Sequence, residues 1–162
     1  DRASQTHSLD VVPAASARDA VVGADIVCTV TSSCEPLLRG EWLAPGAHVN
    51  VVGAATPECR EVDTAAVVRS RVFVDRRESS LHEAGDVMIP LREGAIDEAH
   101  IQGEIGDLLI GRAEGRRSAV EITLFKSLGL AVEDLAAAHV VYTNAERTGA
   151  GTRIELGGMR HA

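Results

Sequence analysis

The fold is decided by one short stretch of sequence, Asp25-Ile-Val-Cys-Thr-Val30. It is apolar and rich in β-branched residues and is bounded by turn residues, a pattern typical of a buried β-strand. The pattern recurs at His48-Val-Asn-Val-Val52, directly after the turn signal Pro45-Gly46. The segment between the two has the length of a crossover connection, and parallel neighbours cannot be joined by a tight hairpin. We therefore predict that these two strands lie parallel to each other.

Helical segments and further strands alternate along the rest of the chain. The predicted helices cover residues 16–22, 35–43, 62–70, 79–84, 96–110 and 130–146, and a loop is predicted at 85–94. The predicted additional strands cover residues 72–75, 120–125 and, near the end, 151–156. This alternation predicts an α/β fold with a doubly wound, Rossmann-type parallel sheet and flanking helices.

The composition restricts the classes of partner. The net charge of −8 comes from 24 acidic against 16 basic residues scattered along the chain, so no basic stripe for nucleic acid or an anionic membrane is present in the sequence. No run of about 18 apolar residues indicates a membrane span. The three cysteines, Cys28, Cys34 and Cys59, have no recognised metal-binding spacing, and we expect no metal site and a reducing cytoplasm.

Small and hydroxylated residues follow each of the two parallel strands predicted at residues 25–30 and 48–52. Thr29, Thr31, Ser32 and Ser33 lie at and just beyond the end of the first, and the second runs into Val51-Val-Gly-Ala-Ala55. The carboxyl ends of parallel strands are where open sheets bind ligands, and hydroxyls or free amides there can contact a nucleotide. A hydroxyl cluster after a strand also forms turns and helix caps, so these residues alone predict only a ligand-binding α/β domain.

Five segments, read in order, make the prediction more specific. They are Gly23-Ala-Asp-Ile-Val-Cys-Thr-Val-Thr-Ser-Ser33, Gly40-Glu-Trp-Leu-Ala-Pro-Gly-Ala-His-Val-Asn-Val-Val-Gly53, Pro57-Glu-Cys-Arg-Glu61, Glu83-Ala-Gly-Asp86 and Phe125-Lys-Ser-Leu-Gly-Leu-Ala-Val-Glu-Asp134. Together they resemble successive signatures of the ornithine cyclodeaminase/mu-crystallin family. The resemblance extends from about Leu9 to about Gly151, and Phe125 to Asp134 is its most characteristic part.

The resemblance implies a homodimer whose protomers bind NAD(H) or NADP(H) in a Rossmann domain and hold a small substrate in a second, dimerising domain. It places residues 1–125 in part of the Rossmann domain and 126–162 in a helix and tail that return toward the substrate domain. It also implies that the glycine-rich phosphate loop and the first strand lie upstream of Asp1. Asp25–Val30 is then expected to have an open edge. The sequence does not decide between NAD and NADP.

The resemblance also implies roles for individual residues. It places Thr31, Asn50, Val51, Val52, Gly53 and Ser127 at the cofactor and Leu128 at the substrate. The alternatives are ordinary structural roles, with Asn50 as a strand residue and Ser127 as the N-cap of the following helix. We expect Gly53 to be small so that the nicotinamide ring can approach the backbone. No catalytic acid is identified.

One position bears on the reaction. The lyases of this family that cyclise ornithine carry a catalytic aspartate after the strand that corresponds to His48–Val52, and Ala55 occupies the matching position here. The resemblance therefore favours the imine reductases, which transfer a hydride between nicotinamide and a cyclic imine such as a pyrroline or piperideine carboxylate. An ornithine cyclodeaminase-type lyase that releases ammonia remains an alternative. So does a binding role without turnover, or the absence of activity in an incomplete chain.

Overall fold

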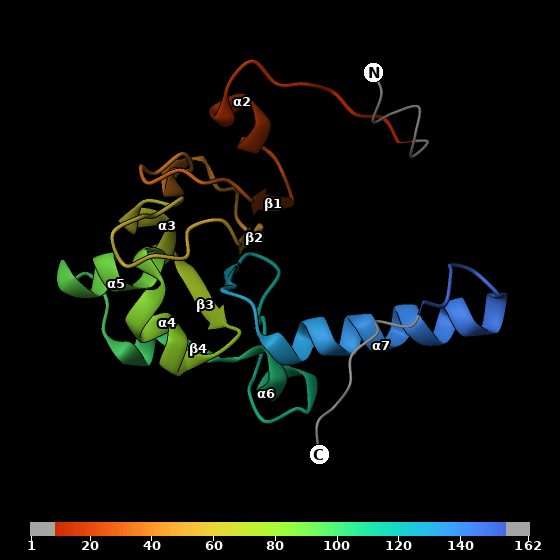
Figure 1. Ribbon diagram of the computed structural model, residues 1–162. Helices are drawn as coiled ribbons and strands as arrows, with labels where there is room; N and C mark the ends of the chain where they lie inside the picture. Colours follow the sequence, from red (N-terminus) through yellow and green to blue (C-terminus); the bar gives the residue numbers. More distant parts are fainter. Residues whose placement is uncertain (1–8, 155–162) are drawn as a thin grey trace. The chain divides into compact units, whose positions relative to one another are not determined.

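The chain is described by a computed structural model that covers residues 9–154. It divides into two compact units, the first ending at Leu128 and the second beginning at Gly129 (Figure 1). The first unit contains one sheet of five strands, β1 (Ile26–Thr29), β2 (His48–Val51), β3 (Ser70–Val74), β4 (Ile101–Glu104) and β5 (Ile122–Lys126). Residues 1–8, which the resemblance assigns to the Rossmann domain, lie outside the described residues.

The sheet is parallel throughout, in the order β1-β2-β5-β3-β4. β1 pairs with β2 from Ile26 opposite His48 to Thr29 opposite Val51, which confirms the predicted parallel pair. Among the described residues β1 is an edge strand, as expected from the sequence. The α/β fold class is therefore confirmed, and all five strands end at the same side of the sheet.

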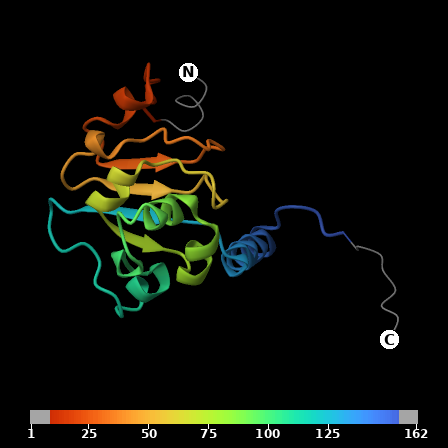
Figure 2. The same ribbon diagram turned by 90° about the vertical axis from the view of Figure 1, so that its left-hand side faces the viewer.

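Short helices precede and connect the strands, and several of them cover one face of the sheet. They are α2 (Ala17–Val21), η1 (Gly40–Trp42), α3 (Thr64–Arg69), α4 (Arg77–Glu83), α5 (Gly85–Arg92), η2 (Glu98–His100) and α6 (Ile105–Leu109). Figure 2 shows helices lying in front of the strands. Burial alternates along β1 and β2, so that Val27, Val49 and Val51 contact the core on one face while Cys28 and Asn50 face the other way.

Local hydrogen bonds explain where several helices begin. Ser16 caps α2, as predicted, because its Oγ accepts a hydrogen bond from the Asp19 amide at 3.1 Å. Asp63 caps α3 in the same way through the Ala66 amide at 2.8 Å. These caps satisfy amides that have no partner inside the helix.

Four predicted elements were wrong in whole or in part. The segment 85–94 is the helix α5 rather than a loop, and Val87 and Pro90 are buried on it. Residues 101–104 form the edge strand β4, so the predicted helix 96–110 is reduced to α6. The predicted helix 35–43 contains only the single turn η1. The described part of the predicted last strand, residues 151–154, is not a strand, and the rest lies outside the described residues.

The second unit consists mainly of one helix, α7 (Ala131–Thr148), which corresponds to the predicted helix 130–146. It ends at Gly149, which adopts a left-handed conformation with φ 68°. Glycine is the usual residue for this cap because it has no side chain to oppose a positive φ.

Candidate functional site

The carboxyl ends of the parallel strands bring four core-facing residues into one row. Thr29, Val51, Lys126 and Val74 lie side by side across β1, β2, β5 and β3. All four are buried, although two of them are polar. The chain segments that follow the strands contain most of the residues predicted to contact a cofactor, so this edge of the sheet is the candidate site.

A buried carboxylate, Glu61, connects the segments that follow β1 and β2. Its Oε1 accepts hydrogen bonds from the Thr31 amide at 2.6 Å and the Thr31 hydroxyl at 2.7 Å. Its Oε2 accepts from the Thr29 hydroxyl and the Gly53 amide, both at 2.8 Å. Burial raises the pKa of Glu61, but the hydrogen bonds from Thr31, Thr29 and Gly53 outweigh it and the pKa lies below its ordinary value of 4.5.

This lowered pKa makes stability depend on pH in a defined direction. A carboxyl whose native pKa is depressed stabilises the fold fully above its unfolded pKa, and that contribution is lost as pH falls through the native value. We predict that the difference in unfolding free energy between wild type and Glu61→Gln is constant above about pH 5 and shrinks below 4.5. Urea unfolding at a series of pH values measures this difference. A difference that is the same at pH 3 and pH 7 would contradict the prediction.

A second buried ionic group lies behind Glu61. Lys126 and Asp86 are both fully buried, and the Lys126 Nζ lies 3.3 Å from the Asp86 Oδ2. Nζ also donates to the Ala54 carbonyl. The other oxygen, Asp86 Oδ1, accepts from the Glu61 amide at 2.7 Å and the Val62 amide at 3.1 Å. Burial raises the pKa of Asp86, and Lys126 and the two amides oppose that effect.

Asp86 differs from most carboxylates near a helix end, which are solvated or serve as caps. Instead, it lies in the first turn of α5 and its carboxylate is enclosed by Lys126 and by the backbone of residues 61–62. The hydrogen bond to Asp86 holds the backbone amide of Glu61, while the carboxylate of Glu61 binds the amides of Thr31 and Gly53.

A third carboxylate, Asp75, fixes the segment that follows β5. Its Oδ2 accepts hydrogen bonds from the Leu128 amide at 2.6 Å and the Ser127 hydroxyl at 3.5 Å. Its Oδ1 accepts from the Arg76 amide at 2.7 Å. Asp75 is only 3% exposed and lies directly after β3, the strand beside β5. Ser127 and Leu128 are thereby held at the same end of the sheet as Thr31 and Gly53.

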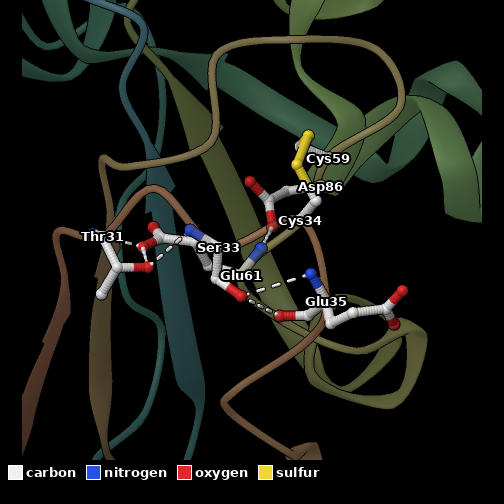
Figure 3. The surroundings of a disulfide bond; sticks show 7 residues. All are labelled: Thr31, Ser33, Cys34, Glu35, Cys59, Glu61 and Asp86. Carbon is white, nitrogen blue, oxygen red and sulfur yellow. Dashed lines mark hydrogen bonds between the residues drawn. A yellow bond between two sulfur atoms is a disulfide. The ribbon is translucent and has the colours of Figure 1, made fainter.

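A disulfide joins the loop after β1 to the loop after β2. Cys34 follows the hydroxyl cluster after β1, and Cys59 precedes Glu61; the two form a disulfide beside Glu61 and Asp86 (Figure 3). Cys28 remains a free, exposed thiol. A sequence separation of 25 gives no local signal for the pair.

The structure brings together five of the seven residues predicted from the resemblance. Thr31, Val52, Gly53, Ser127 and Leu128 follow the carboxyl ends of β1, β2 and β5. Val52 is 41% exposed, whereas the side chain of Val51 is fully buried and can offer a ligand only its backbone. Asn50 lies within β2 on the opposite face, where its side chain contacts His48 and Cys28.

Gly53 is small for a reason that the sequence did not reveal. A Cβ atom at this position would overlap the Thr31 carbonyl oxygen and the Glu61 carboxylate. The side of its Cα on which a Cβ would lie is therefore already filled by the protein. A side chain here would separate the two loops.

Glu61, Asp75 and Lys126 were not among the predicted site residues. Three of the segments that carry the resemblance contain Glu61, Asp86 and Lys126, which was the available signal. The contacts themselves join residues more than twenty positions apart, such as Glu61 to Thr31, Asp86 to Glu61 and Leu128 to Asp75. Hydrophobic periodicity carries no information about such polar pairs.

The surface that this candidate site offers to a ligand is formed by the exposed Val52 and the hydroxyl segment after β1. The charged side chains of the site, Glu61, Asp75, Asp86 and Lys126, are all buried behind that surface. Among residues 9–154, no group of three or more His, Cys, Asp or Glu side chains could hold a metal ion. In the same part of the chain no helix is long and apolar enough to cross a membrane.

Comparisons with known proteins identify relatives of this fold and site. The chain is 42% identical over 142 residues to ketimine reductase mu-crystallin of Mus musculus, covering 88% of this chain and 42% of that protein. It is 39% identical over 143 residues to the Delta(1)-pyrroline-2-carboxylate reductase of Bacillus cereus, covering 88% and 44%. The Thermococcus litoralis Delta(1)-pyrroline-2-carboxylate reductase, solved with NADH and L-proline, superposes with a TM-score of 0.87 at 40% identity and covers 93% of this chain and 47% of that one.

The chain thus spans less than half the length of these relatives. The family model for the ornithine cyclodeaminase/mu-crystallin family matches residues 1–149, almost the whole chain. This agrees with the five segments that carried the resemblance in the sequence and with the parallel sheet. The chain belongs to the ornithine cyclodeaminase/mu-crystallin family.

Proposed function

We propose that this chain forms the nicotinamide-binding part of an NAD(P)-dependent reductase that acts on a cyclic imine, such as a pyrroline or piperideine carboxylate. The observation that carries the proposal is Ala55, an exposed methyl group just beyond the carboxyl end of β2. The matching residue in the lyases of the family is a catalytic aspartate, and a methyl group cannot transfer a proton. The names of the mouse and Bacillus relatives support the same reaction class.

The described residues have a supporting role in this reaction. The bound cofactor would supply a hydride to the imine carbon, with a proton going to the ring nitrogen to give a cyclic amino acid. Thr31, Val52, Gly53 and Ser127 would line the nicotinamide half of the cofactor, and Leu128 would contact the substrate. Asp75 would hold Ser127 and Leu128 in place through the hydrogen bonds at 3.5 and 2.6 Å. The proposal covers NADH and NADPH equally.

One assay separates the proposed reductase from the lyase. The complete gene product is incubated with reduced cofactor and Δ1-pyrroline-2-carboxylate or Δ1-piperideine-2-carboxylate, and loss of reduced-nicotinamide absorbance is followed. In parallel it receives L-ornithine and NAD, and ammonia is measured. Oxidation of the cofactor with no ammonia supports the reductase. Ammonia release from ornithine would replace it with the lyase, and binding of cofactor without either reaction would leave a binding role.

We predict that a carboxylate at position 55 impairs the reductase. Ala55→Asp places a negative charge near the imine substrate, which itself carries a carboxylate, and two like charges a few ångströms apart repel by about 1 kcal/mol or more. The KM for the imine should rise roughly fivefold or more, which is the same free energy expressed as a ratio. Ala55→Asn adds the same bulk without the charge and should change the KM less. Identical kinetics of Ala55→Asp and wild type would place Ala55 away from the substrate.

The further partners and the location are part of the proposal as well. The family suggests a homodimer, which sedimentation of the complete gene product tests, and a cytoplasmic location. Disulfides rarely persist in a reducing cytoplasm, so Cys34 and Cys59 would be thiols there. Alkylation of a freshly lysed culture followed by mass mapping distinguishes the two states, and full retention of the disulfide would count against the cytoplasm.

A further inference from the structure

Glu61 has the features of a residue that sets the shape of a binding site without contacting the ligand. Its side chain is completely buried, so no cofactor or substrate can reach it. Each of its two carboxylate oxygens accepts one backbone amide and one hydroxyl, with Thr31 on Oε1 and Gly53 and Thr29 on Oε2. The carboxylate therefore links the segment after β1 directly to the segment after β2.

The backbone of Glu61 is itself held from two sides. Its carbonyl oxygen accepts hydrogen bonds from the Leu37 amide at 2.9 Å and the Leu38 amide at 3.1 Å. Its amide donates to Asp86 Oδ1 at 2.7 Å, and Asp86 is paired with Lys126. The carboxylate thus extends from an anchored backbone, and any change in its hydrogen bonds must be accommodated by the loops at Thr31 and Gly53. Figure 3 shows Glu61 between Thr31 and Asp86.

We propose that Glu61 is a positioning residue for the nicotinamide half of the cofactor site. This inference rests on the proposed function, since it assigns a role in binding the same cofactor. The carboxylate fixes the distance between the Thr31 and Gly53 backbones, and the cofactor binds to the outer side of these two loops. Because both amides are used by Glu61, the ligand must be recognised there by the remaining carbonyls, hydroxyls and apolar surface.

The hydrogen-bond pattern explains why the charge state of residue 61 matters. Glutamine has nearly the same shape, but one of its terminal atoms is an NH2 donor. Hydroxyls can rotate to accept from that NH2, whereas a backbone amide cannot. Because each carboxylate oxygen accepts one backbone amide, either orientation of the glutamine places its NH2 against the amide of Thr31 or of Gly53. The variant Glu61→Gln must therefore lose one of the two links.

The test measures cofactor affinity in the complete gene product. NADH and NADPH are titrated against wild type, Glu61→Gln and Glu61→Asp in the presence of a dithiol reductant, so that the Cys34–Cys59 disulfide does not hold the loops in place of Glu61. We expect Glu61→Gln to weaken binding of the cofactor at least about tenfold and to raise its KM more than it lowers kcat. Glu61→Asp keeps two acceptor oxygens and should recover part of the affinity.

Two further variants separate positioning from general stability. Ser70→Ala removes a buried hydrogen bond of 2.6 Å to the Ala66 carbonyl at the amino end of β3, remote from the site, and should lower the melting temperature without changing cofactor affinity. Thr29→Val removes only the hydroxyl that Glu61 binds from a residue that is 2% exposed. It should weaken cofactor binding roughly threefold, as loss of one modest hydrogen bond implies. This variant decides the question if Glu61→Gln does not fold.

The outcomes distinguish this inference from the proposed function. If wild type binds NADH or NADPH and both Glu61→Gln and Thr29→Val bind it within twofold of wild type, the positioning role is wrong and the proposed function stands. If wild type binds neither cofactor, both are wrong. If Ser70→Ala weakens binding as much as Glu61→Gln at equal loss of stability, Glu61 is only a structural residue.

Discussion

Replacing Lys126 by methionine is expected to lower the unfolding free energy by about 3–5 kcal/mol, because it leaves the Asp86 carboxylate buried without its cation. Both side chains of this ion pair are completely inaccessible to solvent, and their charged atoms lie 3.3 Å apart. Methionine has a similar length and is apolar, so packing is largely kept and the effect measures the lost charge and the lost hydrogen bond to the Ala54 carbonyl. Urea unfolding of the complete gene product followed by circular dichroism measures the change.

A second substitution should reverse much of this loss. Asp86→Asn removes the buried charge, and its remaining oxygen can still accept from the amides of Glu61 and Val62. The double variant Lys126→Met/Asp86→Asn is therefore expected to be more stable than Lys126→Met alone. The exposed pair of Arg76 and Glu78 provides a control, since its side chains are 57% and 76% exposed and Arg76→Met should cost less than about 1 kcal/mol. A similarly small loss in Lys126→Met would show that Asp86 is stable in the core without its partner.

The predicted strands were right where apolar, β-branched residues recur along a short segment. The segments 25–30 and 48–52 became β1 and β2 because buried parallel strands need apolar, β-branched residues on their core face. β4 was missed because Ile101-Gln-Gly-Glu104 contains a glycine and two polar residues, which an edge strand tolerates. Its single core residue, Ile101, also fits the helical spacing of Ile105, Leu108 and Leu109, and this coincidence favoured the longer helix.

The helix α5 was missed for a different reason. Gly85 and Pro90 are both typical of loops, and each appears inside this helix. The helix forms because Val87 and Pro90 are buried against the core and because Asp86 in its first turn binds Lys126 and the backbone of residues 61–62. Tertiary contacts of this kind override local propensity, and no pattern within residues 85–92 indicates them.

The structure places five of the predicted site residues at one end of the sheet, but the sequence did not indicate the buried groups that hold them there. Parallel strands fix where loops such as those at Thr31 and Gly53 must lie, so strand assignment alone was sufficient to locate the site. The carboxylates that connect the loops belong to other elements: Glu61 precedes α3, Asp75 follows β3 and Asp86 begins α5. Their pairing depends on the folded arrangement of these elements, which composition and periodicity do not contain.

The substitution Gly53→Val is expected to weaken cofactor binding strongly. The Cβ of valine would occupy the position of the Thr31 carbonyl oxygen and the Glu61 carboxylate, so the loops after β1 and β2 must separate or Glu61 must leave its site. Either movement breaks the hydrogen bond of 2.8 Å between the Gly53 amide and Glu61. An overpacked contact of this kind costs about 1–3 kcal/mol, and the affinity for NADH or NADPH should fall by at least about tenfold.

The matched control is Gly106→Val, since nothing lies within 4 Å of a Cβ built on Gly106 in α6. Both variants add the same side chain in place of glycine, so a difference between them reports the crowding at Gly53 and not the chemistry of valine. Gly106→Val should bind the cofactor as wild type does and lose little stability. Titration of both proteins with NADH and NADPH, together with their melting curves, makes the comparison. If Gly53→Val is folded and binds as tightly as Gly106→Val, the close approach of Thr31, Gly53 and Glu61 does not shape the site, because its disruption would then leave the ligand surface unchanged.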